Sequence, residues 1–346
     1  MFATGKFTLR YCAAFLWLSA LCAFVLQGTF VHAIDVAALV DSSDVIVSGT
    51  ATSVTEEGRA TINTACGSLA GKKLLLVLLP DETIKGAPEI ATVSVELVIP
   101  DAPCAIRGVP PEQYGIFFLQ QAGSLYKFSD PLYPYLPAVR SGQPSNGPPL
   151  DRVVEKLGEV LTREHSTKPE ALSSLGALST ISTQSATETL RGACDKTTGN
   201  LRLLIASTLV SRNDLTGLGV IEKALLHPNT EPNYPFVNMA ASLAGLKDPQ
   251  AIPALKRLLQ THEPHITKGV AIALRQSGSA DAEEPLSHLL NDNDKLVRYY
   301  AVVGLGEITR QDEWTPAFDE FQNNESKYLS YWRDWAASNV QKEPQK

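Results

Sequence analysis

The chain has 346 residues, of which 44% are hydrophobic and 19% charged, which is the composition of a globular protein and excludes extended disorder. This length allows about two domains. The formal net charge is −7 and no basic stripe is present, so we exclude nucleic acid as the expected partner.

The first 33 residues have the three parts of a secretory signal. Lys6 and Arg10 supply the positive start, Tyr11–Leu26 is an uncharged apolar run, and small residues precede the expected cleavage point between Ala33 and Ile34. Because a membrane span needs about 20 apolar residues, we expect cleavage, with a retained membrane anchor as the alternative. The mature chain would then be exported, periplasmic or secreted, with no stable membrane insertion.

Residues 34–140 form the first expected domain, in which a short helix at Asp35–Asp41 precedes five strands. The strands are expected at Val45–Ala51, Lys73–Leu79, Val93–Leu97, Tyr114–Leu119 and Leu125–Phe128. The third alternates with period two, which is typical of a half-buried strand. Five short strands with turn-rich joins predict a small closed or nearly closed β-barrel.

This domain contains Ser43–Gly49, Ile84–Gly86 and Tyr114–Leu119, in that order. The succession resembles that of netrin-like or metalloproteinase-inhibitor-like (TIMP-like) barrels of exported bacterial proteins. The resemblance implies an OB-type barrel. It does not imply protease inhibition, because animal inhibitors of this kind present a cysteine at the mature N-terminus, whereas the expected start here is Ile34.

Removal of the signal leaves three cysteines, Cys66, Cys104 and Cys194. Because an oxidising compartment favours disulfides, we predict a bond between Cys66 and Cys104, which share the first domain, and a free thiol at Cys194. The alternative is three buried thiols.

Residues 141–150 are rich in Gly, Pro and Ser and are predicted to be a linker, after which helices continue to the end of the chain. This helical half repeats itself at a spacing of 31 residues: Leu255 aligns with Leu286, and Leu258–Leu259 aligns with Leu289–Leu290. The register continues in the next helix, where Ile266, Val270, Ala271 and Leu274 align with Val297, Ala301, Val302 and Leu305. Self-similarity at this period is typical of a stack of helix pairs.

Asn293–Gly306 is close to the second-helix pattern of HEAT repeats, and residues 151–313 resemble that family. The expected fold is therefore a multidomain α and β chain, in which a small OB-like β-barrel precedes an α-solenoid of HEAT-like helix pairs. Residues 314–346 depart from the repeat pattern and are rich in aromatic residues. We predict a helical cap there with Tyr328, Tyr331, Trp332 and Trp335 on one face, packed in its core or, alternatively, exposed to a partner.

Little in the sequence indicates catalysis. His262 and His265 are weak candidates for half of a metal site, with a solvated turn as the alternative, and we predict no metal and no cofactor. Asp292, Asp294 and Arg298 suggest a carboxylate–guanidinium contact that links neighbouring turns, with a ligand site as the alternative. No nucleophile elbow, P-loop or His-Glu-x-x-His motif occurs.

The leading hypothesis is an exported, non-enzymatic scaffold that binds a protein on the concave surface of the HEAT-like stack. The candidate contact residues are outward positions of second helices, namely Lys268, Arg275, Arg298 and Glu307. The rival is an envelope enzyme or enzyme accessory with a site between barrel and solenoid, since HEAT-like lyases that handle bilins exist. A polar cleft there that held His165 or His227 beside an acid would favour this rival. A purely structural envelope component is the third alternative.

Overall fold

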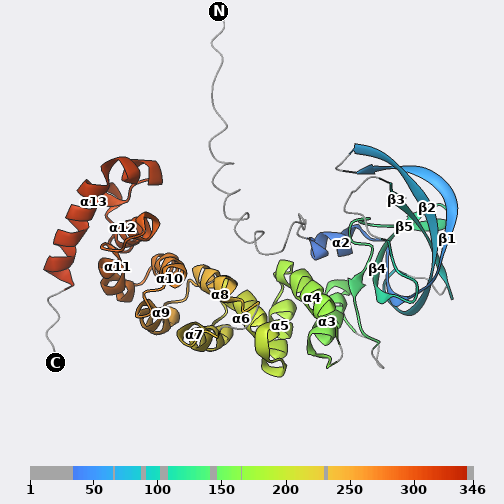
Figure 1. The fold of residues 1–346 in the computed structure, drawn as a ribbon, viewed down its shortest axis with the longest axis horizontal. Coiled ribbons are helices and arrows are strands. Elements are labelled where there is room, and N and C mark those ends of the chain that lie inside the picture. Colours follow the sequence, from blue (N-terminus) through green and yellow to red (C-terminus); the bar gives the residue numbers. More distant parts are fainter. Residues whose placement is uncertain are drawn as a thin grey trace, which may run out of the picture. The chain divides into compact units, whose positions relative to one another are not determined.

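The computed structural model describes residues 34–64, 67–86, 91–101, 108–140, 146–164, 166–229 and 233–340. Within them, a sheet of six strands precedes a run of helices (Figure 1). The sheet and the helices belong to the same compact unit, which begins at Asp35. The predicted order, a β-rich region before a helical repeat region, is confirmed.

The sheet begins after a short helix, α2 (Val36–Ser42), whose N-terminus is capped by the carboxylate of Asp35. The strands are β1 (Val45–Thr64), β2 (Gly67–Lys85), β3 (Val93–Pro100), β4 (Tyr114–Ala122), β5 (Leu125–Phe128) and β6 (Leu136–Pro137). All five predicted strands are present, and β5 has the predicted bounds. β1 and β2 are far longer than predicted, because they pair with each other up to the tip of their hairpin.

The strand pairings form a circuit. β1 pairs with β2, β2 with β3, β3 with β5, β5 with β4, and β4 returns to β1. The pairing of β3 with β5 is parallel, and the others are antiparallel. One apolar core lies against these strands, in which Val47, Leu76 and Phe117 are fully buried. The two-residue strand β6 pairs with the start of β4 and leads the chain toward the helices.

Helices account for most of the described chain after β6. They are α3 (Pro149–Thr162), α4 (Lys168–Thr180), α5 (Gln184–Lys196), α6 (Gly199–Ser211), α7 (Leu218–Leu226), α8 (Phe236–Ser242), α9 (Ile252–Leu259), α10 (Pro264–Ser277), α11 (Glu283–Leu289), α12 (Lys295–Thr309) and α13 (Phe318–Asn339). Pro149, which lies inside the predicted linker, is the first residue of α3, where proline is well accommodated. Residues 141–145 of that linker lie outside the described residues.

The 31-residue register places the same side chains in the same environment twice. Leu255 and Leu286 are at most 1% exposed, and so are Val270 and Ala301 in the following helices. Neighbouring second helices pack against one another, α8 with α10 and α10 with α12, while each of α10 and α12 also packs on its own first helix (Figure 1). The predicted helical solenoid is confirmed.

Glycines allow some of these helices to approach closely. A Cβ atom at Gly269 of α10 would lie 2.3 Å from the carbonyl oxygen of Ala240 in α8, and one at Gly304 of α12 would lie 2.9 Å from Leu286. Gly217 is similarly confined, whereas a Cβ at Gly219 would meet no atom within 4 Å. Gly217 and Gly304 are therefore positions of close packing, whereas Gly219 is open.

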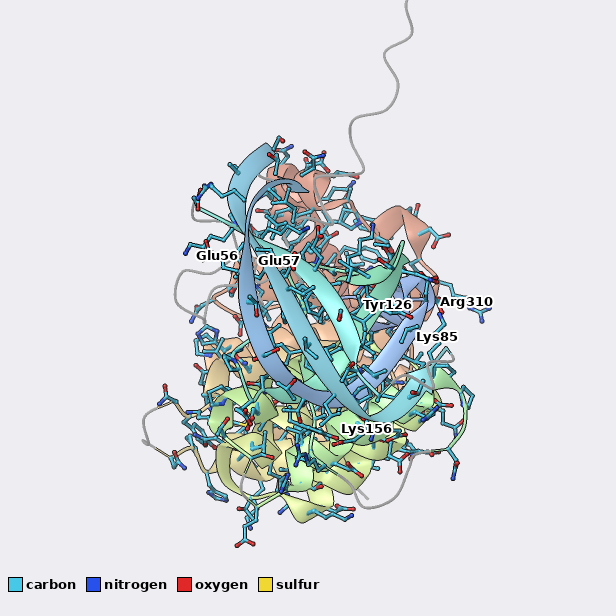
Figure 2. All side chains as sticks on the ribbon, turned by 90° about the vertical axis from the view of Figure 1, so that its right-hand side faces the viewer. Glu56, Glu57, Lys85, Tyr126, Lys156 and Arg310 are labelled. Carbon is cyan, nitrogen blue, oxygen red and sulfur yellow. The ribbon has the colours of Figure 1, made fainter. Side chains whose placement is uncertain are left out.

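The sheet is joined to α3 by a buried cluster of charged side chains, which we call the junction cluster: Glu82 of β2 with Arg152 and Lys156 of α3. Arg152 Nη2 lies 2.7 Å from Glu82 Oε1, and Lys156 Nζ lies 2.6 Å from Glu82 Oε2. The Lys156 side chain, labelled in Figure 2, is only 2% exposed. Arg152 also donates to the carbonyl oxygens of Thr83 and Ile84. The contact therefore fixes the end of β2 against α3.

The last helix, α13, closes the stack with aromatic side chains. Phe321, Tyr328 and Trp332 are at most 1% exposed, and a kink at Asn324 interrupts the helix between them. Of the four aromatic residues predicted to share a face, Tyr328 and Trp332 are buried, as expected for a cap, and Tyr331 and Trp335 are half-buried.

Candidate functional site

A groove of about 970 Å³ lies between the α9–α10 pair and the α11–α12 pair. We call it the repeat groove. Its lining residues are Lys256, Leu259, Gln260, His262, Pro264, Thr267, Glu284, Pro285, His288, Leu289, Asn291, Asp292, Asn293 and Asp294. Each repeat supplies the end of its first helix and the turn that follows, so the groove exists because the two turns stack side by side.

Local backbone chemistry fixes the shape of both turns. His262 has a φ of +54°, a left-handed conformation that ends the turn after α9, and the next residue, Glu263, caps α10 by accepting from the Ile266 N–H at 3.0 Å. In the second repeat Asp294 caps α12 through the Leu296 N–H at 2.7 Å. The two turns that form the walls of the groove are therefore held in place by the helix caps of Glu263 and Asp294.

The groove combines apolar side chains with a polar rim. Leu259, Pro264, Pro285 and Leu289 supply the apolar part. Asp292 and Asp294 each use Oδ1 to accept a backbone N–H, and within the described chain no hydrogen bond or ion pair engages either Oδ2 atom. Two carboxylate oxygens on the rim are therefore available to a ligand.

Glu284 is the rim carboxylate with the most partners. Lys256 Nζ lies 2.7 Å from its Oε2, and His288 Nε2 lies 3.2 Å from its Oε1. The hydrogen bond from Lys256 is the main cause that lowers the pKa of Glu284, with the charges of Lys256 and His288 acting in the same direction. Glu284 is thus held ionised by its own neighbours and joins α9 to α11.

The predicted metal candidates do not gather a ligand set. His262 lines the groove with its Nδ1 2.9 Å from the carbonyl oxygen of Gln260, whereas His265 is exposed on α10 and is not part of the lining. Among the described residues, no group of three or more His, Cys, Asp or Glu side chains is placed to hold a metal ion.

The predicted contact residues on second helices are largely engaged within the stack. Arg275 of α10 binds Glu307 of α12 with nitrogen–oxygen distances of 2.7 and 2.8 Å. Arg298 of α12 binds Glu325 of α13 at 2.6 Å. Lys268, half-buried on α10, forms no ion pair within the described chain. These arginines join neighbouring helices, and their binding of a partner stays a prediction.

The predicted contact of Arg298 with the carboxylates of Asp292 and Asp294 is wrong in its detail. Arg298 instead donates to the backbone carbonyl oxygens of Asp292 and Asn293, because both aspartate side chains are turned toward backbone N–H groups. The carboxylate partner is Glu325, 27 residues further along the chain.

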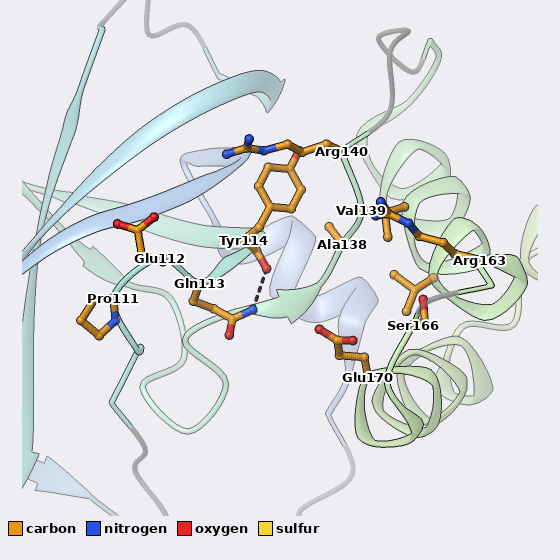
Figure 3. A pocket seen from close by; sticks show the side chains of 11 residues that line it. Pro111, Glu112, Gln113, Tyr114, Ala138, Val139, Arg140, Arg163, Ser166 and Glu170 are labelled. Carbon is orange, nitrogen blue, oxygen red and sulfur yellow. Dashed lines mark hydrogen bonds between the residues drawn. The ribbon is translucent and has the colours of Figure 1, made fainter.

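A second, more polar hollow of about 520 Å³ lies where the sheet meets α3 and α4, and we call it the junction hollow (Figure 3). Tyr114 and Arg140 are on its sheet side, and Arg163, Ser166 and Glu170 are on its helix side. This is the place where the rival enzyme hypothesis puts a site. His165 lies outside the described residues, and His227, at the end of α7, is not in the lining.

The predicted disulfide cannot be placed, because Cys66 and Cys104 both lie outside the described residues. Cys194 of α5 is a free, buried thiol, as predicted, and burial raises its pKa. A thiol held protonated in this way is a weak nucleophile. No helix in the described part of the chain has the length and apolar character needed to cross a membrane.

Comparison with known proteins supports the helical repeats. A family model for HEAT repeats matches residues 235–318, which include α8 to α12 and the repeat groove. Among solved structures, the chain is similar to one from the complex of CpcE and CpcF of phycocyanin lyase from Nostoc sp. PCC7120. The identity is 22% and the TM-score 0.37, over 51% of this chain and 72% of that one. No curated protein matches the chain.

Proposed function

We propose that this chain is a protein-binding scaffold whose repeats hold a short segment of a partner protein in the repeat groove. The observation that carries the proposal is the groove itself, a hollow with an apolar part and a polar rim inside the region that matches HEAT repeats. Helical repeats commonly bind partners on the face to which their connecting segments map. The groove lies at such connecting segments, beside α9 to α12.

Binding fits the groove chemistry better than catalysis. The hydroxyl of Thr267, which lines the groove, donates to the backbone carbonyl of Glu263 at 3.1 Å rather than to a base. Glu284 is paired with Lys256 and His288. A nucleophile and a base within reach of one another, which acyl or group transfer requires, are not found among the described lining residues.

The groove also indicates the chemistry of the bound segment. Leu259 and Leu289 would contact apolar side chains of the partner, and the free Oδ2 atoms of Asp292 and Asp294 would accept from a lysine or arginine. The expected segment therefore has apolar residues next to a basic one.

The test is capture of a partner by matched variants of the mature chain. Leu259→Glu places a charge among the apolar groove residues, and Leu79→Glu, at a leucine of β2 that is already 44% exposed, is the control. We expect the wild type and Leu79→Glu to retain the same partner from the envelope fraction and Leu259→Glu to lose it. Retention by a folded Leu259→Glu protein would contradict the proposal.

We further propose that the scaffold is exported after cleavage between Ala33 and Ile34. The support is the signal-like pattern of the first 33 residues. Mass spectrometry of the chain recovered from its own cells should give an N-terminus at Ile34 in the extracytoplasmic fraction. An intact N-terminus in the cytoplasm would contradict this part of the proposal.

For the sheet, we propose the OB-type barrel that the sequence resemblance implies. The circuit of pairings, with β3 parallel to β5 and β4 back on β1, supports this assignment. In native-state hydrogen exchange, the amides shared by β1 and β4 should exchange only with global unfolding of the sheet. Fast exchange confined to that pairing would indicate an open sheet instead.

A further inference from the structure

We propose that the junction hollow is a second binding site, separate from the repeat groove, and that it takes a small zwitterion such as a short peptide with free ends. Its volume of about 520 Å³ is in the range of small-molecule sites. A smaller hollow shares three of its lining residues, Val139, Arg140 and Arg163, and extends it along α3.

The helix side of the hollow carries an unpaired positive group. Arg163 follows α3, and within the described chain its guanidinium forms no ion pair and no hydrogen bond. Arg140 differs, because it donates to Thr50 at 2.8 Å, lies 3.5 Å from a carboxylate oxygen of Asp81 and covers the ring of Tyr114. Arg163 is therefore the guanidinium in the lining that can still take a carboxylate.

A buried hydroxyl, that of Ser166, lies in the same turn as that arginine. The backbone N–H of Ser166 donates to the carbonyl of Arg163 at 3.2 Å, so both residues belong to one turn. The Ser166 Oγ atom is buried and has no hydrogen-bond partner. Because an unsatisfied buried hydroxyl is costly, an acceptor oxygen supplied by a ligand would complete it. A carboxylate can receive bonds from Arg163 and Ser166 together.

The sheet side of the hollow carries an unpaired negative group. Glu112 forms no ion pair in the described chain and has a φ of +62°, a left-handed conformation that is unusual for glutamate. The turn is closed by the Gln113 N–H, which donates to the carbonyl of Pro110, and the Glu112 N–H donates to the carbonyl of Ala51. This geometry keeps Glu112 at the hollow, across from Arg163 (Figure 3).

Of the remaining acid of the lining, Glu170, one carboxylate oxygen is already engaged. Glu170 accepts from both the N–H and the hydroxyl of Thr167 in the capping box of α4. Arg163 and Glu112 are thus the charged groups of this lining that form no hydrogen bond or ion pair through their side chains within the described chain, and they lie on opposite sides of the hollow. A ligand with a carboxylate at one end and an ammonium at the other matches both.

The experiment uses the mature full-length chain and three probes: the dipeptide Ala-Ala, its N-acetyl form and its C-terminal amide. Binding is measured by titration calorimetry and saturation-transfer NMR. We expect Ala-Ala to bind, and the acetylated and amidated forms each to bind about tenfold more weakly, as expected for the loss of one charged hydrogen-bonded contact.

Variants assign each end of the ligand. Arg163→Gln and Ser166→Ala should weaken binding of Ala-Ala and of its acetylated form but leave the weak binding of the amide unchanged. Glu112→Gln should weaken binding of Ala-Ala and of its amide but leave the weak binding of the acetylated form unchanged. Arg310→Gln, at an exposed arginine after α12 (Figure 2), is the matched control and should bind like the wild type.

Equal binding of all three probes, no binding of Ala-Ala, or full binding by Arg163→Gln would each overturn the proposal. Acetate and inorganic phosphate are run in parallel, and tighter binding of either than of Ala-Ala would replace the zwitterion by a simple anion. Because Leu259→Glu leaves this hollow intact, failure here and failure of the scaffold proposal are distinguishable.

Discussion

The junction cluster and the contacts between repeats use the same kinds of charged side chain in opposite surroundings. At the junction, the side chains of Glu82 and Lys156 are 11% and 2% exposed. Between repeats, Arg275 and Glu307 are 31% and 43% exposed. A buried charge that loses its partner cannot regain water, whereas an exposed one can. The junction therefore depends on its charges, and the repeats depend on close backbone contact at positions such as Gly269.

The largest effect is expected at the junction. Glu82→Ala leaves Lys156 and Arg152 without their shared carboxylate, and we expect a loss of about 3–5 kcal/mol in the free energy of unfolding. Urea denaturation followed by circular dichroism measures it. Glu284→Ala, which removes an exposed carboxylate that also contacts two nitrogen-bearing side chains, Lys256 and His288, is the control and should cost less than about 1 kcal/mol. If Glu82→Ala and Glu284→Ala lost the same free energy of unfolding, burial would not make the junction pair more important to stability than the exposed pair.

The next effect tests backbone contact between repeats. Gly269→Ala brings a methyl group against the Ala240 carbonyl, so we expect a loss of about 1–3 kcal/mol in thermal or urea unfolding. Gly219→Ala is the matched change in an open position of α7 and should stabilise the chain by about 0.5–1 kcal/mol, since alanine favours the helix. If Gly269→Ala left the free energy of unfolding unchanged, the contact between α8 and α10 would be looser than described.

A smaller effect is expected for the exposed pair of α10 and α12. The double-mutant cycle Arg275→Ala with Glu307→Ala should give a coupling energy of about 0.2–1 kcal/mol, reduced by added salt. A coupling above about 2 kcal/mol that is insensitive to salt would place this pair in the same class as the junction cluster.

The smallest effect separates two adjacent acids of α11 by pH. The pKa of Glu284 is lowered mainly by the hydrogen bond from Lys256, so its ionised form stabilises the fold above the ordinary glutamate range. That contribution is lost as pH falls through the lowered pKa. Burial raises the pKa of Glu283, so its ionised form is unfavourable in the fold and protonation relieves it.

The opposite effects of ionised Glu284 and ionised Glu283 on stability can be measured with one pair of variants. Near neutral pH, Glu284→Gln should lower the free energy of unfolding and Glu283→Gln should raise it, each by about 0.5 kcal/mol or less. Both differences from the wild type should vanish in acid, below the lowered pKa of Glu284. Differences of the same sign near neutral pH would contradict the assigned causes.

The repeats were predictable from sequence because their information is local. Apolar side chains at helical spacing decide which face of α10 or α12 is buried, and the 31-residue register supplies the pairing. The bounds of β5 were predicted correctly for a related reason, because turn residues flank this short apolar run on both sides. The hairpin of β1 and β2 was underestimated, because much of its outer half is Thr, Ser and Glu, whose strand conformation comes from cross-strand pairing.

The place of the junction hollow was predicted by the rival hypothesis, but the residues that line the two hollows were not predictable, because distant segments meet in them. Glu82 and Lys156 are 74 positions apart, and neither carries a local sign that it will be buried. Arg163 and Glu112 line the same hollow because the sheet packs against α3 and α4. The repeat groove likewise depends on how the turn after α9 stacks on the turn after α11. Backbone propensity contains none of this information.

The aromatic side chains of α13 also cover an apolar face of the repeats. Each helix pair offers an apolar face on which another element can pack, and Phe321 and Trp332 of α13, both 0% exposed, are buried where α13 packs on α11 and α12. Trp332 Nε1 also donates to the carbonyl oxygen of Trp314, which holds α13 against the segment that follows α12. A chain shortened before α13 would leave apolar surface of α11 and α12 exposed to water, and surface of that kind favours association between molecules.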